Sequence, residues 1–183
     1  MGDNKQSVDM VEVWRGSIVE SVHKGNAVIC DSRGNILKSW GCPDHTIYPR
    51  SSCKILQALP LIESGASRKL NLDSRHFALA CASHSASALH TGIIKNWLSE
   101  MNLTSDDLRC GIQPIPRIST LSDPGLKRVK PSQLHNNCSG KHTGFLAVSK
   151  HLGCGPEYLD IDHMVQKNIK TVFQEMTDTT SVD

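Results

Sequence analysis

The sequence predicts a mixed α/β chain of the α+β type, with a mainly antiparallel sheet and helices packed on it. Segments rich in valine and isoleucine fill the first 45 residues, whereas segments with helical apolar periodicity follow from residue 51 onward. A length of 183 residues suits one domain with a substantial core. We therefore expect two or three layers built within one domain.

The predicted strands come first. Residues 11–23 and 26–30 have the composition of strands. Residues 31–34 (Asp-Ser-Arg-Gly) are typical of a turn, and residues 35–40 are expected to form the strand that runs back after it. Successive strands joined by short turns pair with their neighbours. The first 45 residues are therefore expected to form an antiparallel meander.

The predicted helices follow. Pro49 suits the first turn of a helix, so a helix is expected from near Ser51 to near Gly65, with a kink or an early end at Pro60. Residues 112–137 contain four prolines and no sustained period, which indicates a long loop. The other helices are expected over residues 73–85, 86–101, 105–111, 138–153 and 162–176.

One helix carries an apolar stripe at i+4 spacing, formed by Leu89, Ile93, Trp97 and Met101. Such a stripe is more often core than a binding surface, and we interpret it as core. Six of the seven cysteines are likewise expected to be small buried apolar residues: Cys30, Cys42, Cys53, Cys81, Cys110 and Cys154.

Composition excludes several function classes. A net charge of +2 and 4% aromatic residues argue against a nucleic-acid partner, and the basic cluster at residues 127–130 is interpreted as a solvated loop. No apolar run is long enough to span a bilayer, so no membrane partner is expected. Seven irregularly spaced cysteines without a signal peptide indicate reduced thiols and a cytoplasmic location.

The strongest candidate for chemistry is the pair Ser51 and Lys54. Within a helix they lie one turn apart on one face, where a lysine can take the proton of a serine nucleophile. The helix N-terminus favours a neutral lysine and developing negative charge. Ser52 would face away from Lys54. The other Ser-x-x-Lys match, Ser21 to Lys24, lies in an expected strand, where the two side chains point to opposite faces.

Two further segments carry polar groups whose role the residue types leave open. Ser83 lies in Ser-His-Ser at the end of an apolar helical run, as a helix-end polar group or as a second hydroxyl near Ser51. Cys138 and Lys141 lie one turn apart at a helix start, which favours a thiolate. Spacing alone gives no zinc signature.

Four segments in order and spacing resemble the rhizobial-type L-asparaginases of the asparaginase II family. They are residues 12–21 (EVWRGSIVES), 48–60 (YPRSSCKILQALP), 82–85 (ASHS) and 135–142 (HNNCSGKH). The resemblance covers almost the whole chain. It implies a fold similar to the serine β-lactamases and serine-dependent glutaminases, and hydrolysis of L-asparagine to L-aspartate and ammonia.

The resemblance also implies roles for individual residues. Ser51 and Lys54 match the Ser-Lys pair, Ser83 matches a second catalytic serine, and Cys138 and Lys141 match two ligands of a zinc ion. A lysine can bind zinc only as the neutral amine. Arg50 and His142 flank these positions as candidate substrate-binding residues, and a homodimer is implied.

The chain departs from the family in length and in one motif. Family members are longer, so residues 1–183 are expected to be the N-terminal portion of a single asparaginase II-type domain, an incomplete fold truncated at its C-terminus. A third zinc ligand and the lysine that partners the second serine would fall beyond Asp183. Ala86 and Ser87 also replace the Gly-Glu that usually follows Ser-His-Ser.

Three alternatives to a working asparaginase remain at this stage. A β-lactamase would usually carry Ser-Asp-Asn and Lys-Thr-Gly, which the sequence lacks. A truncated, inactive chain that binds ligand or partner without turnover is the more serious alternative. A zinc-binding structural module comes third.

Overall fold

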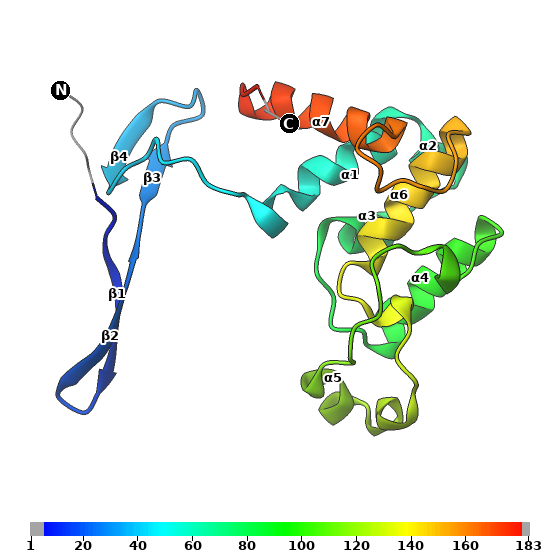
Figure 1. Cartoon of the computed structure of the whole chain (residues 1–183), viewed down its shortest axis with the longest axis horizontal. Coiled ribbons are helices and arrows are strands. Elements are labelled where there is room, and N and C mark those ends of the chain that lie inside the picture. The colour runs from blue at the N-terminus through cyan, green and yellow to red at the C-terminus, as the bar shows by residue number, and fades with distance from the viewer. Residues whose placement is uncertain (1–5, 181–183) are drawn as a thin grey trace. The chain divides into compact units, whose positions relative to one another are not determined.

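The computed structural model describes residues 6–180 and divides the chain into two compact units, residues 1–48 and 49–183 (Figure 1). In the described part, the strands belong to the first unit and the helices to the second. The mixed α+β class predicted from the sequence is confirmed. Every candidate site residue lies in the second unit, so the site can be described within it.

The first unit consists of two antiparallel pairs of strands. β1 (Val8–Arg15) pairs with β2 (Ile18–Gly25), and β3 (Ala27–Cys30) pairs with β4 (Ile36–Trp40). Strand structure is confirmed in the expected segments, although residues 11–23 contain a turn at Gly16 and belong to two strands. The expected meander is wrong, because β2 and β3 belong to different two-stranded sheets. Only Asn26 separates these two strands, and one residue is too short for a hairpin turn.

Apolar side chains remain exposed on both pairs of strands. Trp14 and Val11 are each 56% exposed on β1, and Leu37 on β4 is 68% exposed. A two-stranded sheet buries little apolar surface, so it adds little stability by itself. The hydrophobic core consequently lies in the second unit.

The second unit is helical. Most of its predicted helices are confirmed with shifted ends, whereas only a short 3₁₀ turn forms where a helix was expected over residues 105–111. The expected loop over residues 112–137 instead contains three short helical segments. The α-helices are α1 (Lys54–Glu63), α2 (Ala66–Lys69), α3 (Ser74–Cys81), α4 (Ala88–Glu100), α5 (Arg117–Ser122), α6 (Ser139–Leu152) and α7 (Met164–Thr177). The 3₁₀ segments are η1 (Arg50–Cys53), η2 (Ser105–Asp107), η3 (Pro124–Arg128) and η4 (Gln133–His135).

Local chemistry explains several helix ends. The Asp73 carboxylate accepts hydrogen bonds from the backbone N–H groups of Arg75 and His76, which starts α3 close to the expected helix start at residue 73. Ser87 caps α4 in the same way. Gly153 ends α6 in the left-handed conformation that glycine adopts without strain.

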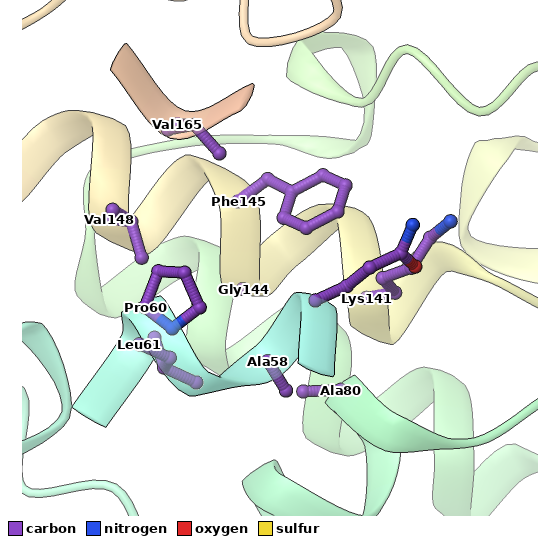
Figure 2. A pocket seen from close by; sticks show the side chains of 10 residues that line it. Ala58, Pro60, Leu61, Ala80, Lys141, Gly144, Phe145, Val148 and Val165 are labelled. Atoms are coloured by element: carbon purple, nitrogen blue, oxygen red, sulfur yellow. The ribbon is translucent and has the colours of Figure 1, made fainter. Parts of the chain in front are cut away.

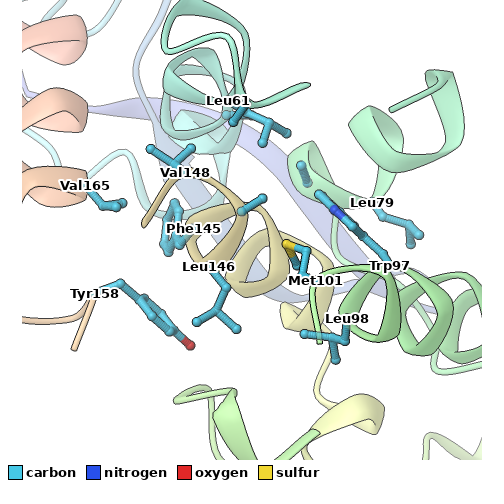
Figure 3. Packing of buried hydrophobic residues seen from close by; sticks show 14 of the residues in the cluster. Leu61, Leu79, Trp97, Leu98, Met101, Phe145, Leu146, Val148, Tyr158 and Val165 are labelled. Carbon is cyan, nitrogen blue, oxygen red and sulfur yellow. The ribbon is translucent and has the colours of Figure 1, made fainter. Parts of the chain in front are cut away.

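α6 is the central helix, and α1, α2, α3, α4 and α7 all contact it. Large side chains from these helices meet around it, as Figure 3 shows for Leu61, Trp97, Phe145 and Val165. Tyr158 from the loop before α7 joins the same cluster and is 0% exposed. Gly140 lets α6 approach α3, since a Cβ atom there would lie 2.5 Å from the carbonyl oxygen of Leu79.

The interpretation of the α4 stripe as core is only partly confirmed. Trp97 and Met101 are buried, whereas Leu89 is 68% exposed and Ile93 is half-buried. Residues at i+4 spacing drift by about 40° per step, because four residues turn through about 400°. Over three steps the stripe therefore turns from solvent into the core, where Ile94 and Leu98 are buried beside Trp97 and Met101.

The cysteines differ from expectation. Cys30 is exposed, and the other six are half-buried with free thiols. Cys81, Cys110 and Cys154 lie at the edge of the core cluster, where their side chains contact it without being enclosed. Within the described residues, no helix has the length and apolar character needed to cross a membrane.

Candidate active site

Ser51 and Lys54 lie on one short helical turn, as predicted. Pro49 precedes η1, and the backbone N–H of Lys54 donates a hydrogen bond to the carbonyl of Ser51. Such an i to i+3 bond stacks the two residues on one face of the chain. The Ser51 side chain is exposed and makes no hydrogen bond with the described residues, whereas the Ser52 hydroxyl donates to the Pro49 carbonyl at 2.5 Å. The hydroxyl of Ser51 is therefore the free one.

The Lys54 side chain turns inward. It is only 3% exposed, and its Nζ donates to Ser83 Oγ at 2.5 Å and to the carbonyl of Ala82 at 3.4 Å. Among the described residues it has no carboxylate partner within ion-pair distance. Lys54 thus joins the start of α1 to the segment after α3, and the structure brings Lys54 and Ser83 into direct contact.

His84 anchors the segment that carries Ser83. Its Nδ1 accepts a hydrogen bond from the Ala86 N–H at 3.1 Å, so the proton of the neutral ring lies on Nε2 and is donated to Ser139 Oγ at 2.8 Å. Burial lowers the pKa of His84 to about 4, and His90, Lys54 and His135 add to this effect. The neutral ring therefore ties Ser83 to the start of α6.

Ala86 has a left-handed backbone, with φ of 57°, and is fully buried. The resemblance implies a glycine at this position, and a glycine would adopt this conformation without strain. A residue with a Cβ atom loses about 1–2 kcal/mol there. The departure from the family pattern consequently falls on a strained residue next to Ser83.

Cys138 and Lys141 lie at the start of α6 but do not hydrogen-bond to each other. Cys138 is the N-cap residue with a half-buried thiol, and Lys141 Nζ lies 5.5 Å from the centre of the Phe145 ring. Zinc sites in proteins use three or four protein ligands. No group of three or more His, Cys, Asp or Glu side chains in residues 6–180 could hold a metal ion. Two donors alone do not fit a zinc site, and zinc binding stays a prediction.

His142 follows Lys141 on α6 and is buried. Its Nδ1 lies 3.0 Å from the Tyr158 hydroxyl, and its ring packs against Phe145 and Tyr158. Burial lowers the pKa of His142 to about 4, with smaller contributions from Lys141 and Lys54. The ring is therefore neutral near pH 7.

The Arg50 side chain makes no polar contact with the side chains of the other candidate site residues. It is exposed, makes no side-chain hydrogen bond with the described residues, and has a left-handed backbone with φ of 47°. Strain of this kind is frequent beside functional groups. The position next to Ser51 is compatible with substrate binding, although no contact to the other candidates supports it.

Two hollows lie near these residues. Lys141 and Phe145 line a mostly apolar pocket between α1, α3, α6 and α7 (Figure 2), with only about 10 Å³ of room for the centre of a water molecule. That is hardly enough for one water. Ser83 and His84 line a wider groove, with about 420 Å³ of such room. Of the two, only the groove has room for an amino acid, and its lining includes Ser83 and His84 but not Ser51, Lys54 or His142.

Sequence reasoning missed two contributors, the hydrogen-bonding role of His84 and the contact of Tyr158 with His142. The only signal for Tyr158 was its rarity, since the chain has two tyrosines. The sixteen positions between His142 and Tyr158 give no local spacing that could reveal the contact. Both contributions became visible only once the loops were placed.

The comparison with known families covers nearly the whole chain. The L-asparaginase II family model matches residues 11–183, which include every candidate site residue. No curated protein matches the chain in sequence. Because the family match covers nearly the whole sequence, the chain belongs to the L-asparaginase II family.

Proposed function

We propose that this chain hydrolyses L-asparagine to L-aspartate and ammonia, with Ser51 as the nucleophile and Lys54 as its general base. The observation that carries the proposal is the placement of Lys54. Its backbone N–H donates a hydrogen bond to the Ser51 carbonyl, and its buried amine donates one to Ser83 Oγ. Membership of the L-asparaginase II family supports the reaction type and an amino-acid amide as the substrate.

The hydrogen bonds of Lys54 suit a general base. A neutral amine has two N–H groups and one lone pair, and Ser83 Oγ and the Ala82 carbonyl can accept both N–H groups. The lone pair is then left for the proton of Ser51. Ser83, held by Lys54, can pass a proton onward or contact the substrate.

The reaction proceeds in two balanced steps. Ser51 Oγ loses its proton to Lys54 and forms a bond to the side-chain amide carbon of asparagine, while backbone N–H groups at the helix start stabilise the oxyanion. The carbon–nitrogen bond breaks, Lys54 returns the proton to the leaving nitrogen, and ammonia departs. Water then hydrolyses the Ser51 ester and releases L-aspartate.

Two of the expectations drawn from the family resemblance remain predictions beside this mechanism. Zinc would be bound through Cys138 and Lys141, and the protein would be a homodimer. No step above passes through a metal ion. The fold similarity to serine β-lactamases and glutaminases also stays a prediction.

The test is ammonia release from L-asparagine by the purified 183-residue chain and three variants. Ser51→Ala and Lys54→Met should abolish release. Ser52→Ala is the matched control, because its hydroxyl is engaged with Pro49, and it should retain activity. A diazoketone analogue of asparagine should add covalently to Ser51, seen by intact mass.

Other results would assign the chain differently. Release that survives Ser51→Ala but is lost with Ser52→Ala would move the nucleophile to Ser52. No release from any protein, together with L-asparagine binding that survives Ser51→Ala, would favour the alternative of a chain that binds ligand without turnover.

A further inference from the structure

Tyr158 is a fully buried tyrosine whose hydroxyl has two neighbours. It lies in the loop between α6 and α7, and its backbone carbonyl accepts a hydrogen bond from Gln166 Nε2 at 2.6 Å. The hydroxyl oxygen accepts a hydrogen bond from the backbone N–H of Arg109 at 2.6 Å and lies 3.0 Å from His142 Nδ1. Both the backbone and the hydroxyl of Tyr158 are therefore held in place.

The hydroxyl has one proton, and the position of this proton follows from its neighbours. The Arg109 N–H is a donor and cannot accept it. His142 Nδ1 is the only other polar atom of the described residues within hydrogen-bond distance of the hydroxyl. A buried O–H without an acceptor would cost about 1–3 kcal/mol. Tyr158 therefore donates its proton to His142 Nδ1.

This hydrogen bond fixes the tautomer of His142. A ring nitrogen that accepts a hydrogen bond carries no proton, so the proton of the neutral imidazole lies on Nε2. His142 Nε2 makes no hydrogen bond with the described residues. Among those residues, the one polar side-chain atom that is both fully enclosed and without a hydrogen-bond partner is Trp97 Nε1, so Nε2 is not fully enclosed. The Nε2–H group therefore retains some accessible surface, although His142 as a whole is only 8% exposed.

The surroundings of His142 favour an oxygen ligand. His142 Nε2–H is a hydrogen-bond donor, and the amine of Lys141, the preceding residue on α6, is another. Donors of this kind suit a carboxylate or amide oxygen. L-Asparagine carries both groups.

We propose that Tyr158 is a positioning residue that fixes His142 as an Nε2–H donor to an oxygen of the bound amino-acid substrate. The inference deepens the proposed function and rests on it for the identity of the ligand. It assigns His142 a donor role and not that of a general base. Arg109 contributes by its backbone N–H, which holds the lone pair of Tyr158 and turns the hydroxyl proton toward His142.

The direct test is the tautomer of His142, measured by ¹⁵N NMR of the 183-residue chain at neutral pH. We expect a protonated Nε2 and an unprotonated Nδ1 that accepts a hydrogen bond. Titration with L-aspartate, the proposed product, should move the Nε2–H signal. A ring protonated at Nδ1, or an Nε2–H signal that ignores the ligand, would overturn the proposal. Neither readout requires turnover, so the result is separate from ammonia release.

Two substitutions provide the second readout. Tyr158→Phe should shift the Nδ1 signal toward that of an unbonded nitrogen and raise the KM for L-asparagine about 2- to 10-fold with a smaller change in kcat. Tyr48→Phe is the matched control, because Tyr48 is 92% exposed, and it should change neither value. A Tyr158→Phe protein that is folded but has an unchanged Nδ1 signal would contradict the assigned hydrogen bond.

Substitution of His142 itself distinguishes donor geometry from simple packing. A glutamine can place an N–H near the position of Nε2, whereas an asparagine reaches only the position of Nδ1. His142→Gln should therefore keep more affinity for L-aspartate than His142→Asn does. Equal losses in both folded variants would overturn the donor role.

Discussion

Lys54 Nζ lies 2.5 Å from Ser83 Oγ, and this contact joins two segments separated by 29 positions in the sequence. The amine is buried and finds only neutral oxygens, since no described carboxylate lies within ion-pair distance. A buried amine without a counter-ion contributes little to stability. Its position is better explained by chemistry than by folding.

Replacement of Lys54 should separate activity from stability. Lys54→Met keeps most of the side-chain volume and removes an amine that has no ion-pair partner, so the free energy of unfolding should change by less than about 1 kcal/mol or rise. Ammonia release should be lost. Urea unfolding and the ammonia assay measure the two effects, with the exposed Lys95→Met as control. A stability loss above about 2 kcal/mol would mean that the contact with Ser83 is structural.

The two glycines on the inner face of α6 should respond in opposite ways to alanine. At Gly140 a new Cβ atom would lie 2.5 Å from a backbone oxygen of Leu79, so Gly140→Ala should destabilise the protein by about 1–3 kcal/mol. At Gly144 the nearest atoms lie at 3.7–3.8 Å, which is ordinary contact. Gly144→Ala should therefore gain up to about 1 kcal/mol from helix propensity.

Thermal unfolding of both glycine variants measures this difference. The ammonia assay adds a second measurement, because Gly140 is adjacent to Lys141 and a displaced α6 would move that side chain. We expect reduced activity only for Gly140→Ala. Equal stability of the two variants would show that α3 can move away from α6 at low cost.

The sequence predicted the local features well. The helical turn after Pro49, the start of α3 near residue 73 and the end of α6 near residue 153 each depend on residues within a few positions, and each was confirmed. The strands were also found, but not their division into two sheets, since it depends on the single residue Asn26. Local propensity therefore sufficed wherever the determining contacts were local.

The site depends on contacts that spacing cannot reveal. The stacking of Ser51 and Lys54 was predictable because they are three positions apart, about one helical turn. The hydrogen bond of His84 to Ser139 spans 55 positions and depends on how two loops pack. Tertiary neighbours also decide whether a buried side chain has an ion-pair partner. The sequence therefore could not show that Lys54 has no carboxylate nearby among the described residues.

Zinc should bind weakly to this chain if Cys138 and Lys141 act as ligands. Two donors fall short of the three or four that hold zinc firmly, so a mild chelator should remove any bound metal during dialysis. Elemental analysis before and after dialysis measures retention, and Cys138→Ser should reduce it further. The exposed Cys30→Ser is the control. Stoichiometric zinc that resists the chelator would require further ligands and would contradict this expectation.

Stability should fall as the solution becomes acidic, because His84 is neutral in the folded protein. Its pKa is lowered from 6.5 to about 4 by burial and by nearby positive groups. Between pH 6.5 and 4 the unfolded chain thus binds the proton more readily than the folded one. The contribution is complete above pH 6.5 and is lost as the pH falls toward 4, by up to about 1.4 kcal/mol per pH unit for each such histidine.

Substitution can isolate the contribution of His84 to this pH dependence. His142 has a similarly lowered pKa, so both histidines should contribute to the slope of unfolding free energy against pH. His84→Gln removes one titrating group and should reduce that slope, because a glutamine stays neutral throughout. His151→Gln, at an exposed histidine, is the control substitution. Urea unfolding at pH 4.5, 5.5 and 6.5 measures the slope, and equal slopes for the wild-type protein and His84→Gln would mean that the buried ring accepts its proton in the folded state as easily as in water.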